Sequence, residues 1–281
     1  MKLPFQINLS GKVAVVTGAG GVLCSDMARA LAQCGAKVAL IGRTLEPLQA
    51  VAETIKAEGG VAAAYTANVL DRAALEAAAE KIHAELGKVD ILINGAGGNN
   101  PRATTDKEYY ESGDIDADTK SFFDLDDEGV QTVFNLNFSG TLIPTQVFAR
   151  DMVESGGNII NISSMNAYTP LTKIPAYSGA KAAINNLTQW LAVHFSRTGI
   201  RVNAIAPGFF STKQNAALLW NADGTPTART GKILAATPMG RFGKSEELLG
   251  ALLYLVNDEA AGFVTGVVIP VDGGFSAYSG V

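Results

Sequence analysis

The feature that most constrains the fold is the alternation of short apolar runs with longer segments of helical period. Seven runs have the length of strands, at 13–16, 38–41, 61–65, 89–93, 158–162, 201–205 and 267–271. Segments of helix length, such as 45–58, 72–86 and 180–196, separate nearly every neighbouring pair. Strands joined by helices pair in parallel through right-handed crossovers. The pattern predicts an α/β, doubly wound Rossmann fold, a seven-stranded parallel sheet with helices on both faces.

The domain organisation follows from what interrupts this alternation. No repeat and no Pro/Ser-rich linker divides the sequence, so residues 1–281 are expected to form a single Rossmann-type domain. Two polar segments break the rhythm, an inserted segment at about 98–129 and a second segment at about 207–243. Because ligands bind beyond the carboxyl ends of the strands in open α/β sheets, both segments are expected to wall or cover a substrate site.

Composition and charge exclude several classes of protein. With 47% hydrophobic and 17% charged residues, the chain can bury a large core. The net charge of -5 is spread without a basic run, so no nucleic-acid partner is expected. Residues 1–12 lack the apolar stretch of a signal peptide and no segment suits a membrane span, which predicts a cytoplasmic protein without a membrane partner. Two cysteines and two histidines predict neither a disulfide framework nor a metal site.

A glycine-rich loop follows the first predicted strand directly. Residues 17–24 read TGAGGVLC and lead into a helix-like segment. Glycines in this context let the chain turn sharply and bring backbone N–H groups and a helix N-terminus onto a pyrophosphate. The loop predicts a dinucleotide site, although a tight turn that binds nothing would have the same letters. Its candidate residues are Gly18, Gly20, Gly21, Val22 and Leu23.

The end of the second predicted strand bears on which dinucleotide binds. Gly42, Arg43 and Thr44 stand where an NAD-selective site places an acid for the ribose hydroxyls. No carboxylate is present, and Arg43 is able to bind a 2′-phosphate or stack on adenine. NADP(H) is therefore the favoured cofactor, with NAD(H) as the alternative. The plainer interpretation is that Arg43 is simply solvated.

The strongest local signal for chemistry is the YxxxK motif from Tyr177 to Lys181. Residues four apart share one helical face, which places the ammonium beside the phenol. That cation is expected to lower the phenol's pKa and make proton exchange efficient near neutral pH. Ser164, at the end of the strand at 158–162, is placed to hold a substrate carbonyl or developing alkoxide. Taken singly, YxxxK is common by chance and Ser164 has the plainer role of ending a strand.

Together with NGAG at 94–97, Asn137 and PGFFST at 207–212, these motifs resemble the short-chain dehydrogenase/reductase family. The resemblance implies an NAD(P)-dependent oxidoreductase acting on a CH–OH group. It implies that Asn137, Ser164, Tyr177 and Lys181 are catalytic, with Asn137 holding a water that links Lys181 to solvent, and that Tyr177 and Lys181 also contact the cofactor. Further cofactor contacts are implied for Asn68, Val69, Asn94, Gly95, Ala96, Pro207, Gly208, Phe210 and Thr212.

Two features depart from the pattern of this family. Its usual loop, TGxxxGxG, has glycines where this chain has Val22 and Cys24, and Gly95 replaces a usual asparagine. Gly20 and Gly21 are expected to supply the missing flexibility, and Cys24 is small enough for close helix–strand packing. The family commonly assembles as a homotetramer through helices that correspond to 130–153 and 180–196 here.

Other segments are similar to those of one subgroup of this family, the D-mannonate oxidoreductases or fructuronate reductases. They include GGNNPRATTD at 97–106, SSMNAYTPLTKIPAYS at 163–178 and TPMGRFG at 237–243. This resemblance implies interconversion of D-mannonate and D-fructuronate, a step of hexuronate breakdown. A sugar acid needs a cation for its carboxylate and polar groups for its hydroxyls. The candidates are Lys173, Arg102, Lys213, Asn99, Asn100, Asn166 and Ser164, with Lys173 and Asn166 as first choices.

Two alternatives stay open at this point. In the first, the chain is an enzyme whose substrate is another sugar acid or polyol, such as gluconate or a keto-deoxy sugar acid, since one fold supports many pockets. In the second, the chain is a non-catalytic nicotinamide-binding sensor. The irregular glycine loop favours the sensor, whereas the four intact catalytic positions favour an enzyme.

Overall fold

A computed structural model describes residues 7–116, 118–212 and 216–280 and confirms the predicted fold class. Seven parallel strands form one sheet in the order β3-β2-β1-β4-β5-β6-β7. Their bounds, in that order, are Val61–Thr66, Lys37–Gly42, Val13–Thr17, Ile91–Asn94, Gly157–Ile162, Ile200–Pro207 and Val268–Val271. The strand order reverses between β1 and β4, so the crevice for a ligand opens at the carboxyl ends of these two strands.

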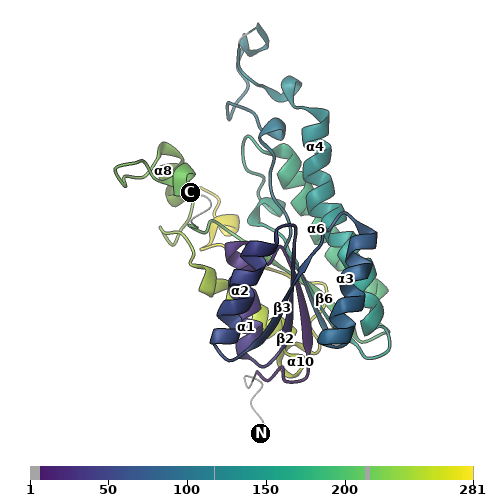
Figure 1. Ribbon diagram of the computed structural model, residues 1–281. Coiled ribbons are helices and arrows are strands. Elements are labelled where there is room, and N and C mark those ends of the chain that lie inside the picture. Colours follow the sequence, from purple (N-terminus) through teal and green to yellow (C-terminus); the bar gives the residue numbers. More distant parts are fainter. Residues whose placement is uncertain (1–6, 117, 213–215, 281) are drawn as a thin grey trace.

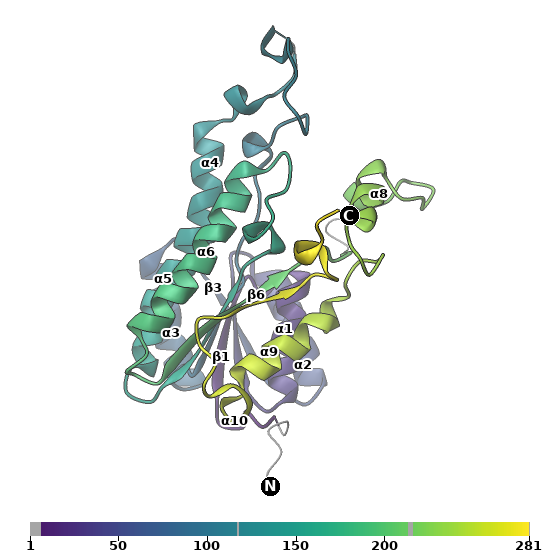
Figure 2. The same ribbon diagram turned by 180° about the vertical axis from the view of Figure 1, so that it is seen from behind.

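Helices cover both faces of the sheet (Figures 1 and 2). One face carries α1 (Val22–Gln33), α2 (Leu45–Ala57) and α9 (Leu249–Val256), and the other carries α3 (Arg72–Glu85), α5 (Gly140–Phe148) and α6 (Pro175–His194). In β1, Ala14 and Val16 pack into the first layer, and Val13 and Val15 pack into the second. A strand buried on both sides requires an unbroken apolar run, which explains the sequence VAVV.

The predicted helices agree with the structure except at one end. The helices expected at 45–58 and 72–86 are α2 and α3. The helix expected at 180–196 instead begins at Pro175, because proline at the first helical position costs no hydrogen bond and its φ angle suits the helix. The earlier start includes Tyr177 as well as Lys181 in α6, in agreement with the shared helical face that the YxxxK spacing predicted.

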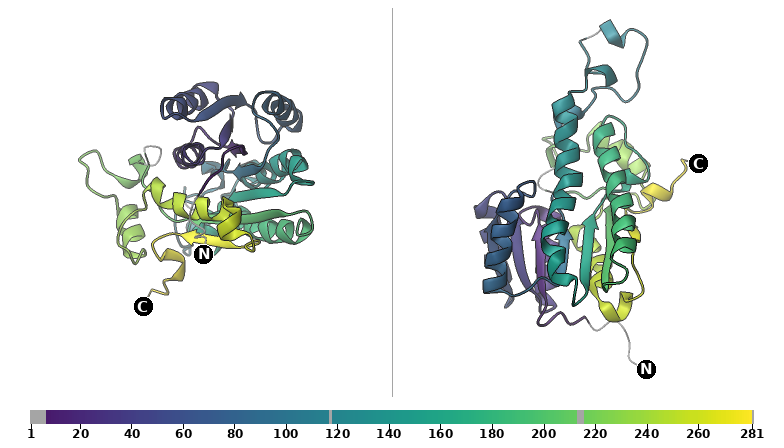
Figure 3. Two further views of the ribbon diagram at one scale, coloured as in Figure 1. Left: turned by 90° about the horizontal axis from the view of Figure 1, so that it is seen from below. Right: turned by 90° about the vertical axis from the view of Figure 1, so that its right-hand side faces the viewer.

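The inserted segment projects beyond the sheet, past α4 (Asp127–Phe134), as the right-hand view of Figure 3 shows. It contains three short 3-10 turns, at Pro101–Ala103, Asp114–Asp116 and Phe122–Asp124. Its own polar contacts order it: the Lys107 ammonium lies 2.7 Å from a carboxylate oxygen of Asp114 and 2.9 Å from one of Glu111. We call residues 98–126 the arm.

The second polar segment carries two short helices, α7 (Ala216–Leu219) and α8 (Ala228–Ala235). The ammonium of Lys232 on α8 lies 2.7 Å from a carboxylate oxygen of Glu108 on the arm. The two interruptions predicted from the sequence therefore meet on the ligand-binding side of the sheet. No helix in the described part of the chain is both long and apolar enough to cross a membrane.

Candidate active site

The glycine loop packs tightly against the loop that follows β4. Gly18 has a φ of 68°, and a Cβ atom there would lie 2.9 Å from the backbone nitrogen of Ala96. Gly21 caps α1 without a side chain, so the first N–H groups of the helix, starting at Val22, point outward with no partner inside the helix. Such N–H groups bind anions, and the loop thus fits a pyrophosphate.

The two departures from the family pattern lie against each other. A Cβ atom on Gly95 would lie 2.2 Å from Sγ of Cys24, far inside van der Waals contact, and 2.9 Å from the carbonyl oxygen of Thr17. The Cys24 side chain therefore fills the space that a side chain at position 95 would need. The thiol is buried, which raises its pKa to about 11, so Cys24 has a packing role.

Thr17 is a site residue that the sequence reasoning missed. Its buried hydroxyl accepts hydrogen bonds from the backbone nitrogens of Gly95 at 3.1 Å and Ala96 at 3.3 Å. One side chain at the end of β1 thereby fixes the loop after β4 against the glycine loop. The sequence signal that could have identified it is a threonine directly before the first glycine of the glycine-rich loop.

A cavity of about 150 Å³ opens beside this loop pair and collects the residues expected around the adenosine. It is lined by Gly18, Gly42, Arg43, Ala67, Asn68, Val69, Ala96, Gly97 and Leu136. The Arg43 side chain is exposed at its edge, and no acidic residue is among the lining. The structure thus brings together predicted residues from the ends of four strands.

Two residues expected to contact the cofactor have buried side chains instead. The amide nitrogen of Asn94 donates to Thr145 Oγ1 and Asn161 Oδ1, both at 2.9 Å, inside the core between β4, β5 and α5. Phe210 is 6% exposed and packs in the apolar core near Gly243. Both residues stay predictions as cofactor contacts, because a motif gives a residue's place in the sequence but not the direction of its side chain.

At the end of β6, the chain passes very close to the loop after β7. A Cβ atom on Gly208 would lie 2.5 Å from Cα of Asp272, so only glycine fits there. Pro207 is the last residue of β6, and Thr212 lies at the edge of the described segment. Lys213, one of the candidate cations, lies outside the described residues.

The four catalytic candidates come from three elements that converge above β4 and β5. Lys181 and Tyr177 lie on one face of α6, with the ammonium 5.6 Å from the centre of the phenol ring. Asn137 is fully buried in a π-helix, Asn135–Ser139, between α4 and α5. Single π turns inside helices often mark functional sites, and this one directs Asn137 inward.

Gly97 allows Asn137 and Lys181 to approach each other. A Cβ atom at Gly97 would lie 2.7 Å from Oδ1 of Asn137 and 3.2 Å from Nζ of Lys181. The Asn137 amide exchanges hydrogen bonds with Gly98, accepting from its nitrogen at 3.2 Å and donating to its oxygen at 2.7 Å. The side chain of Asn137 is thus held beside the lysine by the loop after β4.

The pKa values of this group correct one expectation. Burial raises the pKa of the Tyr177 phenol, and a hydrogen bond with Ser164 offsets part of that rise. Burial also lowers the pKa of Lys181 to about 8. The ammonium donates to the carbonyl of Ile162 at 2.8 Å rather than to the phenol. The expected lowering by the lysine is not found, since burial and the Ser164 hydrogen bond are the causes of the shift in the pKa of Tyr177.

Ser164 lies beside the phenol, and Asn166 follows it in a short turn. Ser164 caps a 3-10 turn, Met165–Ala167, by accepting from the backbone nitrogen of Asn166 at 3.2 Å. Asn166 is only 4% exposed and its Oδ1 has no hydrogen-bond partner. A buried polar atom without a partner is costly, so this oxygen suits a donor group on a ligand or water.

The remaining substrate candidates divide into free and occupied groups. Arg102 is occupied, since its guanidinium lies 2.8 Å from Asp126 and 3.0 Å from Glu128, so it is unsuited to a substrate carboxylate. Asn99 is exposed and donates to Thr104 Oγ1 at 3.1 Å. Lys173, by contrast, lines an open cavity together with Arg229 and two other charged residues that the sequence did not single out.

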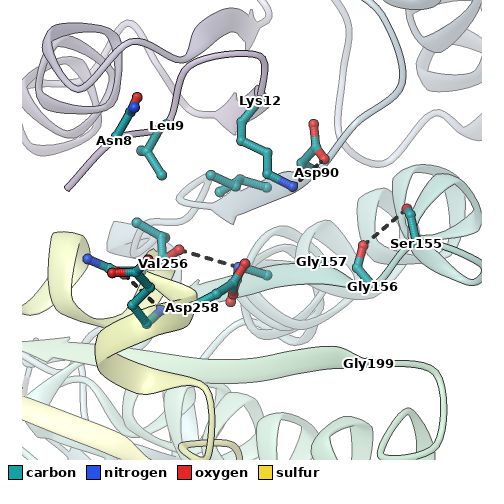
Figure 4. A pocket seen from close by; sticks show the side chains of 14 residues that line it. Asn8, Leu9, Lys12, Asp90, Ser155, Gly156, Gly157, Gly199, Val256 and Asp258 are labelled. Carbon is teal, nitrogen blue, oxygen red and sulfur yellow. Dashed lines mark hydrogen bonds and ion pairs between the residues drawn. The ribbon is translucent and has the colours of Figure 1, made fainter. Parts of the chain in front are cut away.

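Another cavity lies at the opposite end of the sheet and is separate from this site. It is lined by residues that precede strands, including Lys12 before β1 and Asp90 before β4, and by Asp258 of α10 (Asp258–Ala261), as Figure 4 shows. Lys12 and Asp90 form an ion pair at 3.0 Å. The described residues contain no group of three or more His, Cys, Asp or Glu side chains placed to hold a metal ion.

Comparison with known proteins settles the family. The family model for short chain dehydrogenases matches residues 12–221. The chain belongs to the short-chain dehydrogenase family. It is therefore an oxidoreductase that acts on alcohol groups with a nicotinamide cofactor.

Individual relatives extend this assignment. The chain is 58% identical over 282 residues to an uncharacterised oxidoreductase of Haemophilus influenzae, covering 100% of this chain and 99% of the relative. A crystal structure with bound NAD, of a Haemophilus influenzae protein provisionally assigned as a D-mannonate oxidoreductase, matches with a TM-score of 0.95 and 58% identity over all of both chains. A gluconate 5-dehydrogenase from Burkholderia cenocepacia, in complex with NADP and tartrate, matches with a TM-score of 0.82 and 30% identity over 98% of this chain and 99% of that one.

Proposed function

We propose that the chain interconverts D-mannonate and D-fructuronate with NAD(P) as the hydride carrier. The observation that carries the proposal is the cavity between the inserted segment and α8, whose lining includes three cations, Lys173, Arg229 and Lys232. A sugar acid requires a cation for its carboxylate and polar partners for its hydroxyls. The resemblance to a provisionally assigned D-mannonate oxidoreductase at 58% identity supports the same substrate.

The proposed roles of the catalytic residues follow from their positions. When bound, the nicotinamide supplies or accepts the hydride. Tyr177 donates the proton to the ketone oxygen in reduction and removes it from the alcohol in oxidation. Ser164 orients that oxygen by a hydrogen bond. The Lys181 ammonium would bind the nicotinamide ribose, and Asn137 holds a water that passes the proton onward.

The substrate's hydroxyl groups have proposed partners on the same side. The unpartnered Oδ1 of Asn166 accepts a hydrogen bond from one hydroxyl, which removes the cost of leaving it buried and unpaired. Asn99, at the base of the arm, contacts a hydroxyl further from the reacting carbon. Lys173 contributes to binding of the carboxylate.

For the cofactor, we propose that NADP(H) is preferred and NAD(H) also binds. Arg43 is exposed at the edge of the adenosine cavity, and no carboxylate stands there to repel a 2′-phosphate. Arg43→Asp is expected to shift the ratio of kcat/KM for NADPH over NADH toward NADH by tenfold or more. An unchanged ratio would contradict a role for Arg43 in cofactor choice.

The proposed reaction is tested by following oxidation of NADH or NADPH in the presence of D-fructuronate. We expect turnover by the wild-type protein and a loss of at least a hundredfold in Tyr177→Phe, which keeps the ring but removes the proton. Cofactor binding, followed by NAD(P)H fluorescence, controls for folding of the variant. Cofactor binding without turnover of any sugar acid would overturn the proposal and favour a non-catalytic sensor.

A second candidate substrate is another hexonate such as gluconate. The similarity to a gluconate 5-dehydrogenase favours it, at 30% identity over nearly the whole chain. D-Mannonate and D-gluconate differ only at one carbinol carbon next to the carboxylate. Comparing kcat/KM for the two acids in the oxidative direction decides between them.

A further inference from the structure

A cavity of about 440 Å³ lies between the arm, the loop that precedes α6, and α8. Two of its lining residues stand near site residues in the sequence: Lys173 is four residues before Tyr177, and Phe209 directly follows Gly208. Its lining residues are Glu108, Leu171, Thr172, Lys173, Phe209, Ala228, Arg229, Lys232, Ile233, Ala236 and Phe275.

The charged residues of this cavity are unbalanced. Three cations, Lys173, Arg229 and Lys232, face a single carboxylate, Glu108. Only Lys232 is paired with it, at 2.7 Å. That hydrogen bond and the charges of Lys232, Lys173 and Arg229 together lower the pKa of Glu108 below its usual range. Within the described ranges, the side chains of Lys173 and Arg229 make no hydrogen bond or ion pair of their own.

The backbone at Lys173 is strained in a way that favours a functional role. Its φ angle is 72°, a conformation that a residue with a side chain seldom adopts. Its carbonyl is held by a hydrogen bond from the backbone nitrogen of Thr105 on the arm, at 2.9 Å. Strain of this kind persists where the surrounding structure enforces it, and it is concentrated at binding and catalytic sites.

We propose that this cavity binds the substrate's carboxylate between Arg229 and Lys173, and that Glu108 serves as the internal counterion that occupies Lys232 when the cavity is empty. The proposal rests on the proposed function for the identity of the substrate. It assigns a role to the arm, which delivers Glu108 to α8. A guanidinium is suited to the task because it binds a carboxylate through two parallel hydrogen bonds.

The test compares an acid with its uncharged counterpart. D-Fructose differs from D-fructuronate in having a hydroxymethyl group in place of the carboxylate. We expect Arg229→Gln to lower kcat/KM for D-fructuronate about tenfold or more, mainly through KM, and to leave kcat/KM for D-fructose unchanged. Glu108→Gln is expected to act in the opposite direction and lower KM for the acid, because a competing carboxylate is removed.

A readout that does not depend on turnover separates this proposal from the proposed function. In the presence of NADH or NADPH, D-mannonate and D-gluconate are expected to raise the melting temperature of the wild-type protein but not that of Arg229→Gln. The control is Arg197→Gln, which changes an exposed arginine beyond the end of α6. If a sugar acid shifts the melting temperature in this pattern without turnover, the subsite stands and the proposed reaction fails.

Two results would overturn the subsite. In the first, Arg229→Gln and Arg197→Gln give the same KM for the acid and the same ligand-induced shift. In the second, Arg229→Gln lowers kcat/KM for D-fructuronate and D-fructose equally, which indicates a structural defect. A rise in KM for the acid in Glu108→Gln would overturn the counterion role.

Discussion

At the scale of single residues, the site depends on pairs whose members are distant in the sequence. Cys24 and Gly95 each depart from the usual family pattern, and in space the sulfur of one occupies the volume vacated at the other. Gly97 likewise lacks a side chain where Asn137 and Lys181 approach the backbone. The departures at Cys24 and Gly95 therefore compensate each other in space.

The Cys24–Gly95 pair predicts non-additive effects on stability. Gly95→Ala is expected to lower the free energy of unfolding by about 1–3 kcal/mol, because a Cβ atom at that position overlaps the sulfur. In a Cys24→Gly background the same change should cost roughly 1 kcal/mol less, since only the contact with the Thr17 carbonyl remains. Urea denaturation of the wild type, the two single variants and the double variant measures this coupling. The same cycle with Cys34→Gly in place of Cys24→Gly is the control. If the effects of Gly95→Ala and Cys24→Gly on the free energy of unfolding are strictly additive, the pairing is refuted.

Lys181 predicts a conflict between stability and activity. Burial lowers its pKa from 10.5 to about 8, so the charged amine opposes folding below pH 8, by about 3 kcal/mol for a shift of that size. The penalty fades as pH rises from 8 to 10.5, because the folded state then binds fewer protons than the unfolded state. Lys181→Met should therefore abolish turnover and raise the melting temperature of the cofactor-free protein by a few degrees at pH 7.

The pH dependence separates this explanation from a general packing effect. The stabilising effect of Lys181→Met should shrink steadily between pH 8 and pH 10. The substitution also removes the hydrogen bond to Ile162, worth roughly 1 kcal/mol, which sets the residual difference at high pH. A stabilisation that is the same at pH 7 and pH 10 would show that the amine's charge is not its cause.

At the scale of elements, helix ends and insertions position the site. α6 begins at Pro175, so its first turns carry Tyr177 and Lys181. The π-helix between α4 and α5 directs Asn137 inward. The arm meets α8 through Glu108 and Lys232. Each element contributes one part of the site, and loops between them set the distances.

The arm is expected to unfold locally without the core. Asp114 is buried and binds Lys107 and the backbone nitrogen of Glu111, which lowers its pKa. Lys107→Met leaves that carboxylate without its cation, so the arm should become sensitive to limited proteolysis while the melting temperature stays unchanged. Lys81→Met, at an exposed position of α3, is the control. A fall in melting temperature that accompanies the faster proteolysis would show that the arm and core unfold together.

At the scale of the whole molecule, large apolar side chains are exposed on two neighbouring helices, α4 and α6. Phe134 on α4 is 39% exposed, and Trp190 and Val193 on α6 are 58% and 76% exposed. These helices contact each other on one side of the sheet (Figure 3, right). We propose a homotetramer in which this side is an interface.

The proposed assembly makes a direct prediction for mass in solution. Light scattering after size exclusion should give four times the mass of one copy, and Trp190→Lys combined with Val193→Lys should give smaller species, since charges are disfavoured in an apolar interface. The control is Glu53→Lys, which changes an exposed side chain of α2 on the opposite face of the sheet. A monomeric wild-type protein would contradict the proposal.

The sequence by itself determined the fold class, the order of the strands in the sequence and the YxxxK pair. These properties follow from periods of two and 3.6 residues and from a spacing of four on a helix, which are local and readable from the letters. Five of the expected cofactor residues line the adenosine cavity: Gly18 and Arg43 were expected from the ends of the first two strands, and Asn68, Val69 and Ala96 from the resemblance to the family.

Only the tertiary structure decided which side chains face the site and what charge they carry. Asn94 and Phe210 turn into the core, Arg102 is paired with carboxylates, and Arg229 and Lys173 line the same cavity. Burial raises the pKa of Tyr177, whereas the sequence predicted that Lys181 lowers it. Direction, pairing and burial depend on contacts between segments distant in the sequence, and no local pattern encodes such contacts.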